Sequence, residues 1–113
     1  MSLNTDDLEA LVVLAEMGSV SMAAPRLHIT QPAVTRRIQR LEAQVDARLV
    51  VPHGRGVMLT LAGERLAARG RVLLAAMRDA ADEAKESDGF LSGTVNAAVP
   101  PSLGPDTVAD MVE

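Results

Sequence analysis

The chain has 113 residues, of which 48% are apolar and 23% charged, and this suits one small globular domain with appended segments. It contains no cysteine, tryptophan or tyrosine and a single phenylalanine, which excludes disulfides, thiolate metal sites and base stacking on aromatic platforms. The longest apolar runs have six residues and the N-terminus lacks a basic signal segment, so we expect a cytoplasmic protein without a membrane partner.

The net charge is −4, but it is unevenly distributed along the chain. Residues 1–25 carry four acidic residues and no basic one, whereas residues 26–65 carry seven arginines against three acidic residues. Residues 66–113 carry four basic residues against eight acidic ones. The basic middle segment therefore leaves a polyanion partner open, although the chain as a whole is acidic.

Two helices are predicted before residue 30. Thr5 is the expected N-cap of the first helix, and Gly18 ends it. Its apolar residues recur at helical spacing: Leu8, Leu11, Val12 and Ala15. Ser19 or Ser21 caps a short second helix, and Pro25 inside it implies either the later cap or a kink.

The next helix is predicted to begin at Gln31, with Thr30 as its N-cap and Pro32 in its first turn. One narrow stripe on this helix is apolar and contains Val34, Ile38, Leu41 and Val45. The opposite face is polar, carries no acid and contains Pro32, Thr35, Arg36, Gln39 and Arg40. Such residues near a helix N-terminus can reach base edges in the DNA major groove, so the three helices predict a helix-turn-helix. An ordinary amphipathic helix with solvated arginines is the alternative for this segment taken alone.

Two short strands are predicted after this helix, over residues 49–51 and 57–59. Between them, residues 52–56 form a hairpin tip in which Arg55 stands between two glycines. This is the shape of a wing that can place a guanidinium in a narrow minor groove or against the DNA backbone. A plain surface turn is an equally good interpretation of this segment alone. His53 has no second metal ligand at suitable spacing, so we expect no metal site.

Thr60 is the expected cap of a long helix that runs from Leu61 to Glu86. Along it, one seam of heptad type, termed here the linker seam, contains Leu66, Gly70, Leu73, Met77, Ala80 and Ala84. The seam predicts pairing with a second copy of the chain. Residues 87–94 have the composition of a hinge, residues 95–99 suggest a strand, and a helix is expected from Asp106 onward.

In this order, these residues resemble the N-terminal region of LysR-type transcriptional regulators over the whole chain. The resemblance rests on several short motifs: Ala15-Glu16, Gly18-Ser19, Ala23-Ala24, Arg26-Leu27-His28, Thr30 to Arg36 with Ile38 and Leu41-Glu42, Arg48-Leu49, Leu59-Thr60 and Ala62-Gly63. As an ordered set, the motifs are far more specific than any one of them alone. The chain departs from the family pattern at Asp46, Val50 and Pro52, where the family usually has Gly, Phe and Arg, and the last change predicts a weaker wing contact with DNA.

The resemblance implies a mainly α fold in which a winged helix-turn-helix (three helices and a two-stranded wing) is followed by a long dimerisation helix. The implied division is 1–60 for the DNA-binding domain, 61–88 for the linker helix, and 89–113 for a hinge and the start of an effector-binding domain. Family contacts in the major groove carry over to Gln31, Pro32, Thr35 and Arg36, and the wing contact to Arg55. Ser102 corresponds to an effector-binding loop in a full-length form, but this chain should bind no small-molecule inducer.

We therefore expect a sequence-specific regulator that binds pseudo-palindromic double-stranded DNA as a homodimer, with a tetramer as the further assembly of a full-length form. The DNA-binding residues proposed from the sequence are Thr30, Gln31, Pro32, Thr35, Arg36, Gln39, Arg40 and Arg55. The alternative is a winged-helix module for protein interaction that does not bind DNA, which the acidic total favours. We expect no cofactor and no enzymatic activity, because no nucleophile, phosphate loop or ligand cluster is evident in the sequence.

Overall fold

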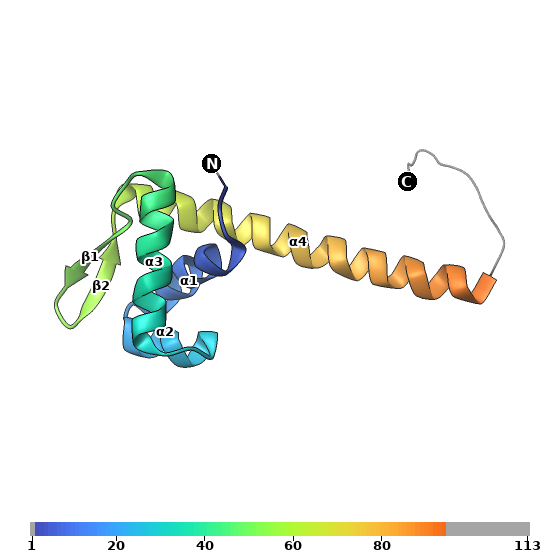
Figure 1. The fold of residues 1–113 in the computed structure, drawn as a ribbon, viewed down its shortest axis with the longest axis horizontal. Helices are drawn as coiled ribbons and strands as arrows, with labels where there is room; N and C mark the ends of the chain where they lie inside the picture. The colour runs from blue at the N-terminus through green and yellow to red at the C-terminus, as the bar shows by residue number, and fades with distance from the viewer. Residues whose placement is uncertain (1, 95–113) are drawn as a thin grey trace. The chain divides into compact units, whose positions relative to one another are not determined.

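The structure is a computed structural model that describes residues 2–94, with side chains to residue 88. It contains four helices and one antiparallel hairpin in these residues (Figure 1). The elements are α1 (Thr5–Met17), α2 (Val20–Leu27), α3 (Gln31–Val45), β1 (Val50–His53), β2 (Gly56–Leu59) and α4 (Leu61–Thr94). The predicted fold class, a mainly α winged helix-turn-helix followed by a long helix, is confirmed. None of the described helices is both long enough and apolar enough to cross a membrane.

The N-cap of α1 is Asn4, so the prediction of Thr5 was wrong by one residue. The Asn4 Oδ1 atom accepts hydrogen bonds from the backbone N–H groups of Asp6 at 2.8 Å and Asp7 at 3.3 Å. Asn is among the strongest N-cap residues because its side-chain oxygen reaches these free amides. At the other end of α1, Gly18 takes the left-handed conformation with φ of 80°, as the predicted helix stop requires.

The cap of α2 is Ser19, whose hydroxyl accepts from the Met22 N–H at 3.2 Å. Ser19 was one of the two predicted caps, and Pro25 lies inside the helix. Since proline has no N–H, Pro25 cannot donate to the carbonyl of Ser21 one turn earlier. His28 closes the helix in the left-handed conformation and donates its backbone N–H to Ala24 and Pro25, which produces the tight turn into α3.

Both predicted ends of α3 are confirmed. The Thr30 hydroxyl accepts from the Ala33 N–H at 3.3 Å, and Asp46 takes the left-handed cap conformation with φ of 55°. The predicted apolar stripe faces inward, because Val34, Ile38 and Leu41 are buried. They join a core of further apolar residues from α1, α2, the segment before β1, and α4: Ala10, Leu11, Leu14, Ala23, Ala24, Leu49 and Ala67.

Both strands of the hairpin are longer toward the tip than predicted, and Leu49 lies before β1. His53 pairs with Gly56 across a two-residue turn, in which Gly54 has φ of 58°. Pro52 lies opposite Val57, whose N–H donates to the Gly18 carbonyl at 3.0 Å and so points away from β1. This is a non-hydrogen-bonded pair, where the missing N–H of proline costs no ladder bond. The predicted hairpin is confirmed, but its tip is shorter than the predicted residues 52–56, because Pro52 and His53 belong to β1 and Gly56 belongs to β2.

Thr60 caps α4 as predicted, because its hydroxyl accepts from the Gly63 N–H at 3.1 Å. The helix continues to Thr94, so the predicted end at Glu86 and the hinge over 87–94 were wrong. Residues 87–94 contain no proline, and extending an existing helix through Gly and Ser costs far less than starting one. The chain divides into two units, Met1–Ala76 and Met77–Glu113. The predicted domain division at residues 60 and 88 stays a prediction.

The first two members of the linker seam pack inside their own domain. Leu66 is half-buried against the core, and Gly70 is buried against the side chains of Leu8 and Val12 of α1. The other members of the seam, Leu73, Met77, Ala80 and Ala84, are exposed. The exposed part of the seam therefore begins at Leu73. Ser102, the predicted strand at 95–99 and the helix predicted from Asp106 lie outside the described residues.

Candidate nucleic-acid interface

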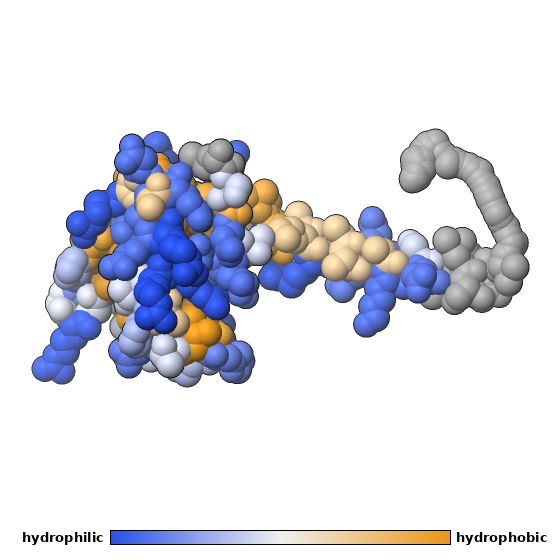
Figure 2. All heavy atoms as spheres, viewed as in Figure 1, coloured by the Kyte–Doolittle hydropathy of each residue, from blue (hydrophilic) through white to orange (hydrophobic). Residues whose placement is uncertain are grey.

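The solvent-facing side of α3 carries the predicted contact residues. All of them are exposed, from the cap of the helix to its third turn: Thr30, Gln31, Pro32, Thr35, Arg36, Gln39 and Arg40. Figure 2 shows a strongly hydrophilic surface over α3 as seen in the view of Figure 1. The only acidic residue of α3 is Glu42, whose carboxylate accepts hydrogen bonds from the backbone at the start of β1. The exposed face therefore has the charge and the side-chain types that a polyanion contact needs.

Arg40 has a partner that its position in the sequence did not reveal. Its Nη2 lies 2.8 Å from Oδ1 of Asp7, and its Nε donates to Oδ2 of the same carboxylate at 3.2 Å. The Asp7 side chain is 0% exposed, whereas that of Arg40 is 56% exposed. The hydrogen bond and the charge of Asp7 raise the pKa of Arg40 above its ordinary value, so the guanidinium stays charged. This bidentate pair joins α3 to α1, and a phosphate contact by Arg40 has to compete with it.

Two other arginines have no such restraint. No carboxylate within residues 2–88 forms an ion pair with Arg36 or Arg55. Arg36 lies in the second turn of α3, on its exposed face, and Arg55 lies at the tip of the hairpin beside Gly54. Their guanidinium groups are therefore available to an anionic partner without the loss of an internal salt bridge.

The hairpin is held against the turn between α1 and α2. The Val57 N–H donates to the Gly18 carbonyl oxygen, and a side chain at Gly56 would collide with that same oxygen. This close approach of two backbones requires glycine at position 56. The end of β2 next to the turn is thus held in place, while Arg55 in the turn itself remains exposed.

A groove of about 310 Å³ separates α3 from β1. Its floor is apolar and includes Ile38 and Val50, while the polar lining residues are Thr35, Gln39, Glu42 and Arg48. Arg48 is an exposed arginine that the sequence did not identify as a contact residue. Its sequence signals were its membership in the basic segment 26–65 and in the motif Arg48-Leu49. Neither signal places it beside α3, because that position depends on how the chain turns after Asp46. Within the described part of the chain, no three potential ligands come together to hold a metal ion.

Comparison with known proteins gives a consistent result. Residues 5–64 match the family model described as bacterial regulatory helix-turn-helix protein, lysR family. The chain is 40% identical over 97 residues to an uncharacterized HTH-type transcriptional regulator of Azotobacter vinelandii, covering 86% of this chain and 67% of that protein. It spans about 30% of the length of several other curated relatives.

Solved structures with the same fold include two complexes with DNA. Vibrio fischeri DarR in complex with DNA matches with a TM-score of 0.74 and 30% identity, covering 80% of this chain and 31% of that chain. The DNA complex of the CbnR DNA-binding domain matches with a TM-score of 0.71 and 32% identity, covering 75% of this chain and 98% of that chain.

Proposed function

The chain belongs to the LysR family of bacterial regulatory helix-turn-helix proteins, and from this premise we propose that it binds operator DNA as a homodimer. In this proposal α3 enters the major groove, with Gln31, Thr35 and Arg36 at base edges. The β1–β2 hairpin is the wing, and Arg55 reaches the adjacent minor groove. The operator is a pseudo-palindrome, because a two-fold dimer presents two identical reading heads.

One observation carries the proposal: Arg36 is exposed on an acid-free helix face, and no carboxylate of the described chain neutralises it. Arginine is the side chain that most often reads guanine, by two parallel hydrogen bonds to O6 and N7. The helix cap supports this role, since Thr30 fixes the start of α3 and leaves the first-turn residues Gln31 and Pro32 on the surface.

The relatives solved with DNA support DNA as the partner over the alternative of a protein-interaction module. They also support a role in regulating transcription. Bacterial transcription takes place in the cytoplasm, so this is where we place the protein. In the basic segment 26–65, arginines outnumber acidic residues. This segment can therefore bind double-stranded DNA although the net charge of the whole chain is negative.

Homodimer formation is supported by the exposed part of the linker seam. Leu73 and Met77 present large apolar side chains to solvent, and Ala80 and Ala84 follow on the same stripe of α4. Small residues at such positions allow two helices to approach closely. A dimer also explains how a small winged helix reaches useful affinity, since the second head binds at high effective concentration.

Fluorescence anisotropy with DNA upstream of the protein's own gene tests the proposal. Arg36→Ala should lose about 1–3 kcal/mol of binding free energy at the cognate site and relax the base preference at one position in each half-site. Arg65→Ala, which removes an exposed arginine of α4, is the matched control and should leave that preference intact. A parent protein that binds cognate and scrambled duplexes equally would contradict sequence-specific recognition.

A further inference from the structure

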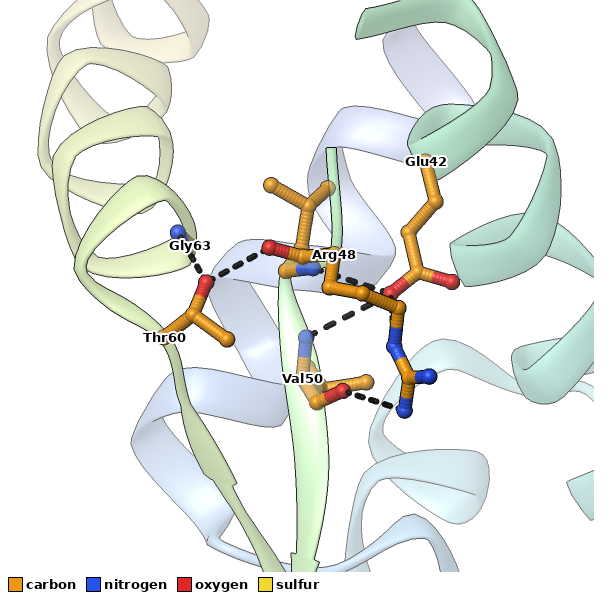
Figure 3. Close-up of polar contacts among 6 residues, drawn as sticks. Glu42, Arg48, Val50, Thr60 and Gly63 are labelled. Atoms are coloured by element: carbon orange, nitrogen blue, oxygen red, sulfur yellow. Dashed lines mark hydrogen bonds and ion pairs between the residues drawn. The ribbon is translucent and has the colours of Figure 1, made fainter. Parts of the chain in front are cut away.

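A side chain of α3 holds the first residues of the hairpin. The Oε2 atom of Glu42 accepts from the Leu49 N–H at 2.9 Å and from the Val50 N–H at 3.5 Å (Figure 3). The Nε atom of Arg48 lies 3.8 Å from the same oxygen. One carboxylate on the helix proposed to read DNA thus fixes two backbone amides at the base of the wing.

The opposite side of the same segment is held by the cap of α4. The Thr60 hydroxyl donates to the Arg48 carbonyl at 2.6 Å while it accepts from the Gly63 N–H, as Figure 3 shows. The Thr60 N–H also donates to the Leu49 carbonyl at 2.9 Å. A side chain at Gly63 would collide with that carbonyl oxygen, so the first turn of α4 lies directly against this segment.

Leu49 is therefore held from both sides. Its N–H is bound by α3 through Glu42, its carbonyl is bound by Thr60, and its side chain is 1% exposed. The hairpin that follows has two strands of four residues each, a size that has little stability of its own in water. The position of its tip therefore depends on contacts outside the hairpin, which are the bond from Val57 to Gly18 near the tip and the anchors at its base.

We propose that Glu42 and Thr60 are positioning residues that set the placement of the wing relative to α3, so that both elements can reach DNA at once. The inference rests on the proposed function, because it concerns how that interface is assembled. Neither residue is among the expected contact residues, and both act through the backbone of residues 48–50. The hydrogen bonds of Thr60 also tie the start of α4 to residues 48–50, and these residues with Glu42 and Thr60 are termed the joint.

The test compares two duplexes with identical half-sites, one flanked by A-tracts and one by G·C-rich sequence. The ratio of the two affinities reports wing placement, because a narrow minor groove attracts the wing arginine. Glu42→Met keeps the side-chain volume but removes the acceptor, and Thr60→Val removes the hydroxyl. Each should lower the ratio by about threefold to tenfold, the factor that one lost hydrogen bond supplies. Discrimination between the cognate half-site and one with a changed base should persist.

Two conservative variants and one destabilised variant serve as controls. Glu42→Gln and Thr60→Ser retain an acceptor oxygen and a hydroxyl, and both should keep the parent ratio. Val12→Ala lowers stability at a buried site of α1 beside Gly70 of α4, and it should leave the ratio unchanged. All variants are compared well below their unfolding temperatures, with folding checked by circular dichroism.

The outcomes separate the two proposals. If Glu42→Met and Thr60→Val keep the parent's ratio of A-tract to G·C-rich affinity, the positioning role is overturned. The same holds if Val12→Ala lowers that ratio as much as they do. Either outcome leaves DNA recognition intact. A fall in Glu42→Gln as large as in Glu42→Met would assign the effect to charge and also overturn it. Parent protein that discriminates neither half-sites nor flanks would overturn the proposed function itself.

Discussion

Asp7 and Arg40 form an ion pair between the interior of the domain and the exposed face of α3. The carboxylate is fully buried, and the guanidinium that neutralises it comes from the exposed face of α3. A buried charge without its partner is strongly unfavourable, so the pair is retained in the folded domain. The raised pKa of Arg40 keeps it charged up to strongly alkaline pH, and its contribution to stability would be lost only above that range.

Asp7→Asn should release Arg40 from the bidentate ion pair. We expect the unfolding midpoint to fall by several degrees, while affinity for any duplex rises and the salt slope steepens by about one phosphate contact. Asp6→Asn is the matched control, because it removes the same charge from a neighbouring exposed site. Equal salt slopes for the two variants would mean that Arg40 already contacts phosphate in the parent protein.

Arg40→Ala tests the same residue from the other side. The change leaves the Asp7 carboxylate buried without its partner, so the domain should melt earlier than Arg36→Ala, whose side chain has no such contact. Thermal unfolding followed by circular dichroism measures this difference. If Arg40→Ala melts with Arg36→Ala and only the salt slope falls by about 1, the residue is a phosphate contact, as the sequence suggested.

Arg55 belongs to the tip of the wing, where no ion pair of the described chain restrains it. Arg55→Ala should weaken binding most on duplexes with A-tract flanks, since a narrow minor groove concentrates negative potential. Anisotropy titrations on matched A-tract and G·C-rich duplexes provide the measurement. The same loss on both duplexes would place Arg55 at a phosphate.

At the scale of elements, the hairpin depends on its docking against the turn after α1. Gly56 lies so close to the Gly18 carbonyl that any side chain would force the strand away and break the bond from Val57. Glu42 and Thr60 hold the opposite end of the hairpin, at the start of β1 and the start of α4. The wing is thus held by contacts with the turn after α1, with α3 and with the start of α4, in addition to the pairing of its own two strands.

Gly56→Ala should destabilise the domain by about 1–3 kcal/mol, the usual effect of overpacking a close contact. Gly54→Ala is a suitable comparison, because nothing lies near its Cβ and only its positive φ opposes a side chain, at about 1 kcal/mol. Urea unfolding of the two variants gives the two free energies. If Gly56→Ala lowers the free energy of unfolding by less than Gly54→Ala does, the turn at Gly18 can move to accommodate the added methyl group.

At the scale of the whole molecule, the linker seam of α4 divides into a buried part and an exposed part. Leu66 and Gly70 complete the core of their own domain, whereas the stripe from Leu73 onward is exposed. A single apolar seam can therefore serve folding in its first part and association in its second.

Leu73→Arg should convert the dimer to a monomer, because two charges would face each other or lie close across the two-fold axis. Leu73 is 50% exposed in the single chain, so each domain should remain folded and helical. Ala68→Arg introduces the same charge on the opposite side of α4 and should leave the dimer intact. Light scattering, circular dichroism and affinity for a palindromic duplex are the readouts. A monomeric variant with parent affinity would separate dimerisation from DNA binding.

The sequence by itself determined the local features of this protein. Thr30 and Thr60 act as caps and Asp46 as a left-handed stop, because these preferences involve backbone groups only a few residues away. Helical spacing likewise identified the buried stripe of α3. Spacing and turn residues also predicted a helix-turn-helix and a wing-like hairpin, and the motif resemblance joined them into one fold class.

Only the tertiary structure decided which partner each surface meets. Helical spacing places Leu66, Gly70 and Leu73 on one stripe, but it does not say whether that stripe faces α1 or a second chain. Arg40 and Asp7 are 33 residues apart, and no local pattern pairs them. Periodicity reports the face on which a residue lies. The group opposite that face is set by the packing of distant segments, and this packing made Arg40 an internal partner and Glu42 an anchor of the wing.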